Sequence, residues 1–375
     1  MPELIGVDRL YSVGVVVRDL HAATMKYAEI FGIDHWEIRD FGPDRLTEAS
    51  SHGRPTQPSF RTATGTTVPP DAASAISLGN PTIPVTFELV QPSSGESPFQ
   101  EFNFARGQGI SHLTLAMRSP EEFASLRDDL KSNGLDIAAS MTVDGTMQRH
   151  FLDTRKALGG FLIEVQVPLG SDGQTSVEVS EVWNHAGAYT RPDGVGPVGV
   201  QGVNHFGVVV DDVMASLARY NELLGVSRWD VRNWRTEPGL LEYPYYRGAP
   251  VDHEYFVGIS LFRDFGFEII QPTLGPSHYN REFHDRWGEG IHHMLLNVTA
   301  SLDDWNSTRD WLESIDVPLV MGADIFDGAV SFCYHDTSAA LGGYILEATL
   351  LKGQSDPSAM EPEYVIDFAA LTSNI

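Results

Sequence analysis

The sequence predicts an α+β protein of two tandem domains, and three observations support that prediction. The length of 375 residues exceeds what one ordinary core holds and fits two domains of about 170 residues each. The two halves of the chain repeat the same motifs. Within each half, an apolar strand-like run, an amphipathic helical run and further strand-like runs follow one another twice. Each domain is therefore expected to pair two strand–helix–strands modules, with curved mixed sheets around a concave cavity.

The duplication is visible in three pairs of matching motifs. VTFELVQP at 85–92 matches GFEIIQP at 266–272, GQGISHLTLAM at 107–117 matches GEGIHHMLLNV at 288–298, and LDTRKALGGFLIEV at 152–165 matches HDTSAALGGYILEA at 335–348. The pairs Glu88/Glu268, His112/His293 and Glu164/Glu347 are 180, 181 and 183 residues apart. Separations this steady indicate a duplicated domain.

A fourth pair of motifs fixes where the two halves differ in length. LYSVGVVVRDL at 10–20 matches VNHFGVVVDDV at 203–213, so Ser12 stands opposite His205 at a separation of 193. The first half therefore holds 13 additional residues between positions 12 and 88 (193 against 180). The Gly-, Pro-, Ser- and Thr-rich stretch at 47–76 is expected to hold them as a long loop.

The same comparison gives the expected boundaries. A first domain is predicted at 1–170 and a second at 200–352, joined by an acidic, glycine-rich linker at 171–199 and followed by a tail at 353–375. Amphipathic helices are predicted at 18–33, 119–135, 211–226 and 301–317. The second and fourth open with SPEE and SLDD, a serine N-cap followed by early acids.

Composition restricts the classes of partner. The net charge of −26 argues against a nucleic acid or an anionic membrane surface, because both require a basic footprint. The single cysteine, Cys333, excludes an internal disulfide framework and fits a reducing compartment. The first residues show neither a basic n-region nor a long apolar run, so a cytoplasmic protein is expected.

Four residues in the second half carry the chemistry: His205, Glu268, His293 and Glu347. Each sits in a short apolar strand-like run, where an imidazole or a carboxylate is costly to bury unless it is paired or bound to a metal. Two nitrogen and two oxygen ligands suit one divalent cation. Ligand type alone does not choose among Mn, Fe, Co, Ni and Zn.

These motifs resemble the vicinal oxygen chelate superfamily, which includes glyoxalase I, methylmalonyl-CoA epimerase and the extradiol dioxygenases. The resemblance covers nearly the whole chain as four βαβββ modules, two per domain, and implies metal ligands on the first and last strands of each module. His205 matches the first-strand histidine and Glu268 the acid of an E-L-x-x-P run. His293 matches the second-module histidine, and Glu347 the terminal acid of a G-G-x-x-x-E run.

The first half lacks one member of this set. It keeps Glu88, His112 and Glu164, but Ser12 stands where the histidine is expected, and a serine hydroxyl is a poor ligand for a transition metal at neutral pH. We expect the first domain to be metal-free and to stabilise or shape the second. Weak binding of a second metal by the remaining three residues stays open.

The expected activity is a metal-dependent epimerisation or isomerisation. A divalent ion polarises a carbonyl oxygen and acidifies the neighbouring C–H, and a glutamate can then move the proton. Glu268 and Glu347 are expected to be both ligands and acid/base groups, with His205 and His293 as permanent ligands. The expected partner is a small-molecule carbonyl substrate: a hydroxyketone, a 2-acyl-CoA or, by the resemblance, a cyclitol ketone of the valiolone type. A homodimer is left open.

Two alternatives remain at this stage. An Fe(II) extradiol dioxygenase would use His205, His293 and Glu347, although Glu268 would then fill a position that O₂ needs. Such relatives also carry an acid/base histidine where DGAVSF at 327–332 has Gly328, so His253 or His335 would have to substitute. The second alternative is a non-enzymatic protein that binds a small molecule in the concave cavity.

Other residues received structural interpretations. His292 is expected to face away from its neighbour His293, as a core or second-sphere residue. Gln91 and Gln271 are expected to be strand-end residues, and the aromatic run YPYYRG at 243–248 to be loop packing or the rim of the cavity. His185, His278 and His284 are expected to be surface or core histidines.

Overall fold

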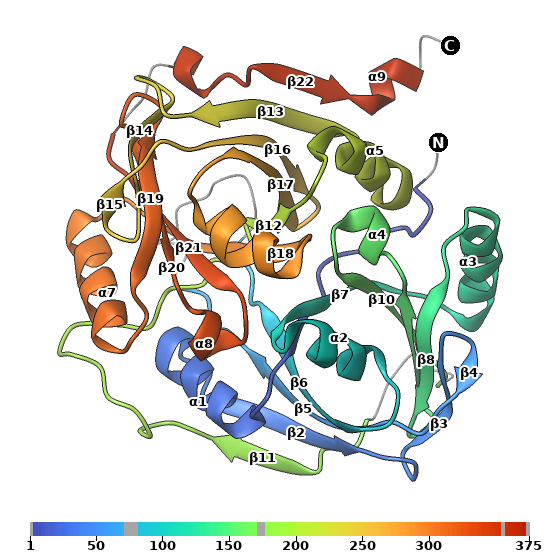
Figure 1. Cartoon of the computed structure of the whole chain (residues 1–375). Coiled ribbons are helices and arrows are strands. Elements are labelled where there is room, and N and C mark those ends of the chain that lie inside the picture. The colour runs from blue at the N-terminus through green and yellow to red at the C-terminus, as the bar shows by residue number, and fades with distance from the viewer. Residues whose placement is uncertain (1–2, 71–81, 171–176, 354–356, 373–375) are drawn as a thin grey trace. The chain divides into compact units, whose positions relative to one another are not determined.

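Figure 1 shows the chain as a computed structural model, which describes residues 3–70, 82–170, 177–353 and 357–372. The chain divides into two compact units, Met1–Thr67 with Val85–Tyr189 and Glu222–Gly225, and Val68–Pro84 with Thr190–Asn221 and Val226–Ile375. Each unit contains one curled, mixed sheet of 11 strands. The predicted α+β class with tandem curved sheets is confirmed.

The first sheet and its helices come from the first half of the sequence. Its strands are β1 (Ser12–Val16), β2 (His35–Phe41), β3 (Leu46–Ser51), β4 (Arg54–Pro55), β5 (Ser59–Thr66), β6 (Thr86–Ser94), β7 (Gly109–Met117), β8 (Ile137–Val143), β9 (Met147–Leu152), β10 (Leu162–Pro168) and β11 (Glu181–Asn184). Its helices are α1 (Leu20–Phe31), α2 (Pro98–Arg106), α3 (Pro120–Ser132) and α4 (Arg155–Leu158).

The second sheet repeats this order. Its strands are β12 (His205–Val209), β13 (Arg228–Arg235), β14 (Leu241–Tyr246), β15 (Ala249–Pro250), β16 (Glu254–Phe262), β17 (Phe265–Leu274), β18 (Gly290–Thr299), β19 (Leu319–Ile325), β20 (Val330–His335), β21 (Ile345–Leu351) and β22 (Tyr364–Asp367). The helical segments are α5 (Val213–Leu224), a π-helical segment η1 (His278–His284), α6 (Asp285–Trp287), α7 (Leu302–Ser314), α8 (Ser338–Leu341), a 3₁₀ turn η2 (Pro357–Met360) and α9 (Phe368–Thr372).

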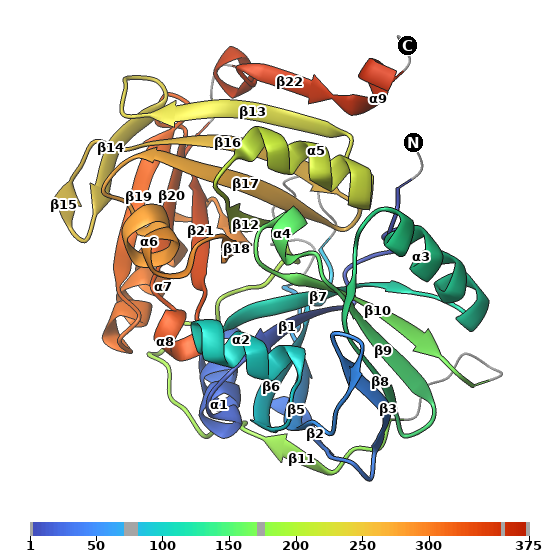
Figure 2. The same cartoon turned by 45° about the vertical axis from the view of Figure 1, so that its right-hand side comes forward.

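The two modules of each unit join through their first strands. In the second unit β12 pairs in parallel with β17 and antiparallel with β18, and β18 pairs in parallel with β21. In the first unit β1, β6, β7 and β10 have the same pairings. The two module sheets thus become one continuous curled sheet, and each module supplies two of its four central strands. Figure 2 shows the curl after a turn of 45°.

Equivalent aromatic clusters hold the first helix of each unit against its sheet. Tyr27 of α1 meets Trp36 and Phe87 edge-on, at ring-centroid distances of 5.8 and 5.1 Å. In the second unit Tyr220 of α5 contacts Trp229 and Phe267 in the same way, at 5.8 and 4.8 Å. The tyrosines and tryptophans are at most 1% exposed.

The predicted loop at 47–76 is wrong over most of its length. Residues 46–51, 54–55 and 59–66 form β3, β4 and β5, and a tight turn with positive φ at His52 and Gly53 joins the first two. The composition misled because Ser and Thr occupy strand positions, as in β5, where buried and partly buried residues mix. The extra length lies between Thr66 and Thr86, where the second unit joins β16 to β17 with only two residues; 71–81 fall outside the described residues.

Strands also occur in the segments that the sequence assigned to a linker and a tail. β11 lies within 171–199 and β22 within 353–375. The two strands are equivalent in the repeat, because their first residues, Glu181 and Tyr364, are 183 residues apart. β11 pairs antiparallel with β2, and β22 pairs antiparallel with β13. Each unit thus ends by adding a strand to the edge of its own sheet.

In the part of the chain that the structure describes, no helix is long and apolar enough to span a lipid bilayer.

Candidate metal centre

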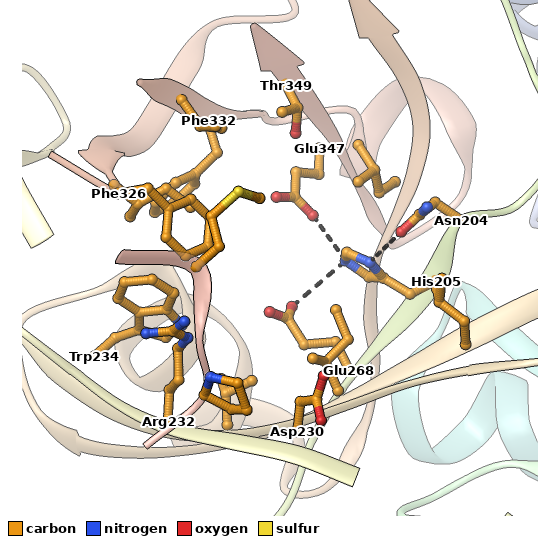
Figure 3. A pocket seen from close by; sticks show the side chains of 18 of the residues that line it. Asn204, His205, Asp230, Arg232, Trp234, Glu268, Phe326, Phe332, Glu347 and Thr349 are labelled. Carbon is orange, nitrogen blue, oxygen red and sulfur yellow. Dashed lines mark hydrogen bonds and ion pairs between the residues drawn. The ribbon is translucent and has the colours of Figure 1, made fainter. Parts of the chain in front are cut away.

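The structure brings the four candidate ligands of the second unit together. One ligand atom each from His205, Glu268, His293 and Glu347 lies within 4.8 Å of the others. The Nε2 atom of His205 is 3.0 Å from Glu347 Oε2 and 3.5 Å from Glu268 Oε2. The Nε2 atom of His293 is 3.2 Å from each of these oxygens. Both imidazoles and both carboxylates therefore point at one place, and Figure 3 shows Glu268 and Glu347 approaching His205 from opposite sides.

The strand register explains this convergence. Gly207 of β12 is the neighbour of Glu268 on one side and of His293 on the other. A Cβ atom at Gly207 would overlap the His293 ring, so only glycine lets this imidazole cross the strand to reach the ligand cluster. Gly14 has the same relation to His112 in the first unit. The glycine two residues after His205 is thus part of the site, a signal present in the HFG sequence.

Each imidazole is oriented through its other nitrogen. Nδ1 of His205 is 3.0 Å from Asn204 Oδ1, and a proton donated from Nδ1 to this oxygen would leave Nε2 free to bind a metal. Nδ1 of His293 is 3.0 Å from Nδ1 of His292, whose Nε2 is 2.8 Å from Nδ1 of His278. A fixed second nitrogen is the usual arrangement for histidine ligands of metals.

His292 was expected to face away from His293, and the reason it does not is a β-bulge. The β12–β18 register shifts so that Gly207 pairs with His293 and Val208 with Ile291, which leaves His292 as the extra residue. Its side chain therefore contacts the neighbouring His293. The first unit has the same bulge, and there Ser111 Oγ lies 2.9 Å from His112 Nδ1.

The electrostatics of the cluster favour a positive charge. Burial disfavours the charged form of His293, but the carboxylates of Glu268 and Glu347 outweigh this and raise its pKa to about 9. Burial likewise opposes ionisation of Glu347, yet its contacts with His205 and His293 lower its pKa. The carboxylates thus stabilise a positive charge at this point. Without a metal ion, that charge is the extra proton on His293.

A second observation, the lack of hydrogen bonds to two of the candidate ligand atoms, also fits a divalent metal ion. Among the described residues, Glu268 Oε2 and His293 Nε2 are buried and make no hydrogen bond with acceptable geometry. Buried polar atoms without partners are rare and costly, and here both are metal-ligating atoms. Two imidazole nitrogens and two carboxylate oxygens are a donor set that suits Mn, Fe, Co, Ni or Zn.

The corresponding place in the first unit contains an arginine. The guanidinium of Arg149 donates to both oxygens of Glu88 at 2.9 and 2.6 Å, and its Nε donates to Glu164 at 2.5 Å. Arg149 is 5% exposed, and its attraction to the two carboxylates holds the pKa of Glu88 below the usual range against the effect of burial. The positive charge between the two carboxylates is therefore covalently part of the chain.

Ser12 completes this difference between the units. Its hydroxyl donates to Thr114 Oγ1 at 2.9 Å, and Thr114 donates to Glu164 at 2.6 Å. Glu88, His112 and Glu164 still have ligand atoms within 4.8 Å of one another, but Arg149 already occupies the carboxylates. The equivalent of Arg149 at a separation of 183 is Phe332, which leaves the carboxylates of the second unit without a guanidinium.

The ligand cluster of the second unit opens into a cavity of about 610 Å³. Three of the four ligand candidates, His205, Glu268 and Glu347, line it. The other walls are mostly apolar and aromatic: Trp234, Tyr255, Val257, Ile259, Leu295, Phe326, Phe332 and Tyr334. Figure 3 shows Trp234, Phe326 and Phe332 across the cavity from His205. This volume and lining are typical of a small-molecule site.

The remaining histidines lie elsewhere. His253 and His335 are buried and do not line the cavity. His185 bonds Thr24 Oγ1 at 2.9 Å, and His284 pairs with Asp211 at 2.7 Å. His278 is a buried partner of His292. These three are structural residues, except that His278 and His292 support a candidate ligand.

Two further interpretations can be checked against the structure. Gln91 and Gln271 accept hydrogen bonds from the backbone N–H groups of Leu20 and Val213, at 2.9 and 3.1 Å, so they hold the starts of α1 and α5. The aromatic run at 243–248 does not line the metal-site cavity; Tyr243 and Tyr245 line a separate, shallower pocket.

Comparisons with known proteins identify the fold. No family model matches the chain, and no curated protein matches it. A mutant of 4-hydroxymandelate synthase from Streptomyces coelicolor superposes with a TM-score of 0.51 and 11% sequence identity, over 98% of this chain and 100% of that one. The Mn(II)-bound glyoxalase from Novosphingobium aromaticivorans gives a TM-score of 0.41 and 15% identity, over 93% and 84%.

The first of these likenesses concerns the fold alone because its sequence identity is low, and the second is too weak to support a conclusion. Together with the two curled sheets, the first shows that this chain has a two-domain fold of the vicinal oxygen chelate type. Its activity has to be inferred from its own site.

Proposed function

We propose that this protein is a divalent-metal-dependent epimerase or isomerase that moves a proton next to a carbonyl group. The observation that supports it is the convergence of two imidazoles and two carboxylates within 4.8 Å at the wall of an apolar cavity. His205 and His293 would hold the metal through Nε2, and Glu268 and Glu347 through Oε2. A bound divalent ion supplies Lewis acidity to a carbonyl oxygen and so acidifies the adjacent C–H.

The protein supplies the proton transfer. Glu268 lies on β17 and Glu347 on β21, and their carboxylates face the same place from opposite sides. One glutamate would take the proton from the carbon next to the carbonyl, and the other would return a proton to the opposite face. The apolar walls exclude water and so limit loss of the intermediate to side reactions.

Ring cleavage of a catechol is less well supported. The carboxylate of Glu268 joins the cluster and does not point away, so it competes for a position that O₂ chemistry needs open. Neither His253 nor His335 lines the cavity to act as the acid/base histidine. A purely binding function that uses only the apolar cavity would not require two imidazoles and two carboxylates to converge at its wall.

The test combines metal analysis with a proton-exchange assay. Protein purified without oxygen is analysed for metal alongside His205→Ala and Glu268→Gln, with Ser12→Ala as the matched control from the first unit. Exchange of the C–H next to the carbonyl is followed by NMR in D₂O, over a panel of hydroxyketones, cyclitol ketones and 2-acyl thioesters.

We expect about one equivalent of Mn, Co, Ni or Zn per chain, lost in His205→Ala, weakened in Glu268→Gln and unchanged in Ser12→Ala. Exchange should need the metal and should stop in Glu268→Gln and Glu347→Gln. One equivalent of Fe(II) that survives Glu268→Gln would favour ring cleavage instead. Absence of metal from every preparation would overturn both enzymatic functions.

A further inference from the structure

We propose that Arg232 recognises an anionic group, a carboxylate or a phosphate, on a substrate whose aromatic or apolar body separates that group from its metal-binding carbonyl. This inference rests on the proposed function, since it assumes that the carbonyl end lies at the ligand cluster. It narrows the substrate class and makes Arg232 the specificity-determining residue.

Arg232 reaches the cavity because of the strand period. Arg228, Asp230, Arg232 and Trp234 alternate along β13, and all four line the cavity. The intervening Trp229 and Val231 are buried, at most 1% exposed. In Figure 3, Arg232 and Trp234 lie across the cavity from His205, so one wall carries the ligand cluster and the opposite wall carries a cation.

Arg232 makes no direct ion pair among the described residues, although the carboxylates of Glu363 and Asp230 are near enough to act on it electrostatically. Its guanidinium donates one hydrogen bond, to the carbonyl oxygen of Ala359 at 3.2 Å. Asp230 pairs with Arg228 at 3.5 Å, and Glu363 pairs with Arg235 at 3.1 Å. Arg228 and Asp230, which also line the cavity, offset each other, so a net charge of one positive is left when a divalent ion balances Glu268 and Glu347.

Aromatic rings hold this cation in place. The guanidinium carbon lies 5.3 Å from the Trp234 ring centroid and 5.2 Å from that of Phe326. The two ring centroids are 5.5 Å from each other, so the guanidinium packs against a pair of adjacent rings, which restrict its rotamers and shield it partly from water. An anion that enters the cavity would therefore meet an oriented donor in surroundings less polar than bulk water, where charge-assisted hydrogen bonds are stronger.

The first unit provides an internal comparison. Arg39 of β2 is the equivalent of Arg232 at the separation of 193 that relates Ser12 to His205. Arg39 pairs with Glu37 at 2.6 Å, whereas the residue at the corresponding place in the second unit is Asp230, which is shorter by one methylene and pairs elsewhere. The unit whose metal site is replaced by Arg149 thus also neutralises this arginine internally.

The walls between Arg232 and the ligand cluster determine the rest of the substrate. Phe326, Phe332, Tyr255 and Ile259 offer apolar and aromatic surface but few hydrogen-bonding groups. A polyhydroxylated ring would lose its hydrogen bonds with water here without replacing them. An aryl or alkyl ketone with an anionic end is a better match than a cyclitol ketone.

The test uses chelating probes of known charge. Benzohydroxamate binds metals through two neighbouring oxygens and is paired with its 4-carboxy and 4-phosphonooxy derivatives and with a homologue that has one methylene before the carboxylate. Binding of each to the Mn(II)-loaded full-length protein is measured by isothermal titration calorimetry. Wild type is compared with Arg232→Gln, Arg232→Lys and, as matched control, Arg39→Gln.

We expect at least one anionic probe to bind wild type about tenfold or more tightly than benzohydroxamate. Arg232→Gln should abolish this preference, so that charged and uncharged probes bind the variant equally; Arg232→Lys should retain part of it, and Arg39→Gln should retain all of it. Which anionic probe gains more distinguishes a carboxylate from a phosphate. Thermal unfolding checks that each variant is folded.

Two results would overturn the inference in different ways. If benzohydroxamate binds but charge gives no advantage, or the advantage survives in Arg232→Gln, then Arg232 does not select the substrate and the proposed metal-dependent function stands. If the protein neither retains Mn(II) nor binds any hydroxamate, then the proposed function and the inference fail together.

Discussion

Besides Ser12, one residue separates the two sites: in the first unit Arg149 lies between the carboxylates, and its equivalent in the second unit is Phe332. Its guanidinium contacts both Glu164, whose side chain is fully buried, and Glu88, whose side chain is 12% exposed. A buried ion pair adds little net stability, but removal of one partner leaves the other charge buried and uncompensated. The arginine is thus expected to stabilise this unit's core by compensating both carboxylates.

Replacement of Arg149 by Met should therefore destabilise the protein strongly. The change leaves two buried carboxylates without their cation and should cost about 3–5 kcal/mol of unfolding free energy, measured by urea denaturation. Arg155→Met is the control, because Arg155 makes its ion pairs with Asp153 and Glu101 at 34% side-chain exposure and should lose no more than about 1 kcal/mol. Equal losses in the two variants would contradict the role given to Arg149.

The sequence contained the signal for Arg149 but gave no reason to notice it. The separation of 183 that matches Glu164 with Glu347 also matches Arg149 with Phe332. A charged residue in a strand next to polar neighbours usually faces solvent, and only the folded structure shows Arg149 donating to Glu164 of the adjacent β10 and to Glu88 of the more distant β6. His205, Glu268, His293 and Glu347, in contrast, stand out because each acid or imidazole interrupts an apolar run.

At the scale of the element, the pairing of β12 with β18 positions the metal centre. Gly207→Ala should push the His293 ring away from the cluster, since the new Cβ would overlap it. We expect Mn(II) affinity, measured by calorimetry, to fall about tenfold or more, with overpacking costing about 1–3 kcal/mol of stability. Gly14→Ala makes the equivalent clash with His112 and should cost similar stability without changing Mn(II) affinity.

The C-terminal segment forms a second element-scale feature, because it completes the cavity without contributing a ligand. Met360 and Pro362 line the cavity, and the Ala359 carbonyl accepts from Arg232. A chain ending at Lys352 should keep its metal, since the ligands are on β12, β17, β18 and β21. It should bind hydroxamate probes about tenfold more weakly through lost apolar contact. Loss of the metal in this truncated chain would contradict this assignment.

Sequence patterns could not reveal these edge strands. Four-residue strands such as β11 and β22 are too short to show a period, and each lies in a polar, acidic context typical of linkers. They form because β2 and β13 present a free edge within their own unit. The central strands were predictable from their apolar runs, whereas the edge strands depend on a partner that the local sequence does not contain.

At the scale of the whole molecule, buried neutral histidines should make stability depend on pH. Burial lowers the pKa of His150, His253 and His335 to about 4. The unfolded chain takes up these protons near pH 6.5, so stability is complete above that pH and is lost as pH falls from about 6.5 towards 4. Each histidine contributes up to about 1.4 kcal/mol per pH unit in this window.

Urea midpoints of metal-free protein at pH 7, 6 and 5 test this expectation. Glu88 has a lowered pKa, so the stability that it contributes is lost only as pH falls below its usual pKa. It therefore does not account for a loss of stability above pH 5. His335→Gln should reduce the dependence, because one of the histidines with a lowered pKa is removed. Identical midpoints at pH 5 and pH 7 would show that these histidines are accessible to protons in the folded state.

The duplicated fold also makes a prediction about metal stoichiometry. The two units share the register, the bulge and the glycine that place their ligands, and they differ at Ser12 against His205 and at Arg149 against Phe332. Ser12→His combined with Arg149→Phe should therefore restore two imidazoles and two carboxylates in the first unit. We expect this double variant to bind two equivalents of Mn(II) per chain where wild type binds one, as measured by metal analysis after dialysis.

The energetics of the double variant strengthen this test. Without Arg149 the carboxylates of Glu88 and Glu164 need a cation, so metal binding and folding of this unit become linked, and Mn(II) should raise its unfolding temperature. The reverse exchange, Phe332→Arg, should place a guanidinium beside Glu268 and Glu347 and reduce the stoichiometry to zero while the protein remains folded. The double variant could instead fold without metal and bind only one equivalent. That result would show that Ser12 and Arg149 do not explain why the first unit lacks a metal site.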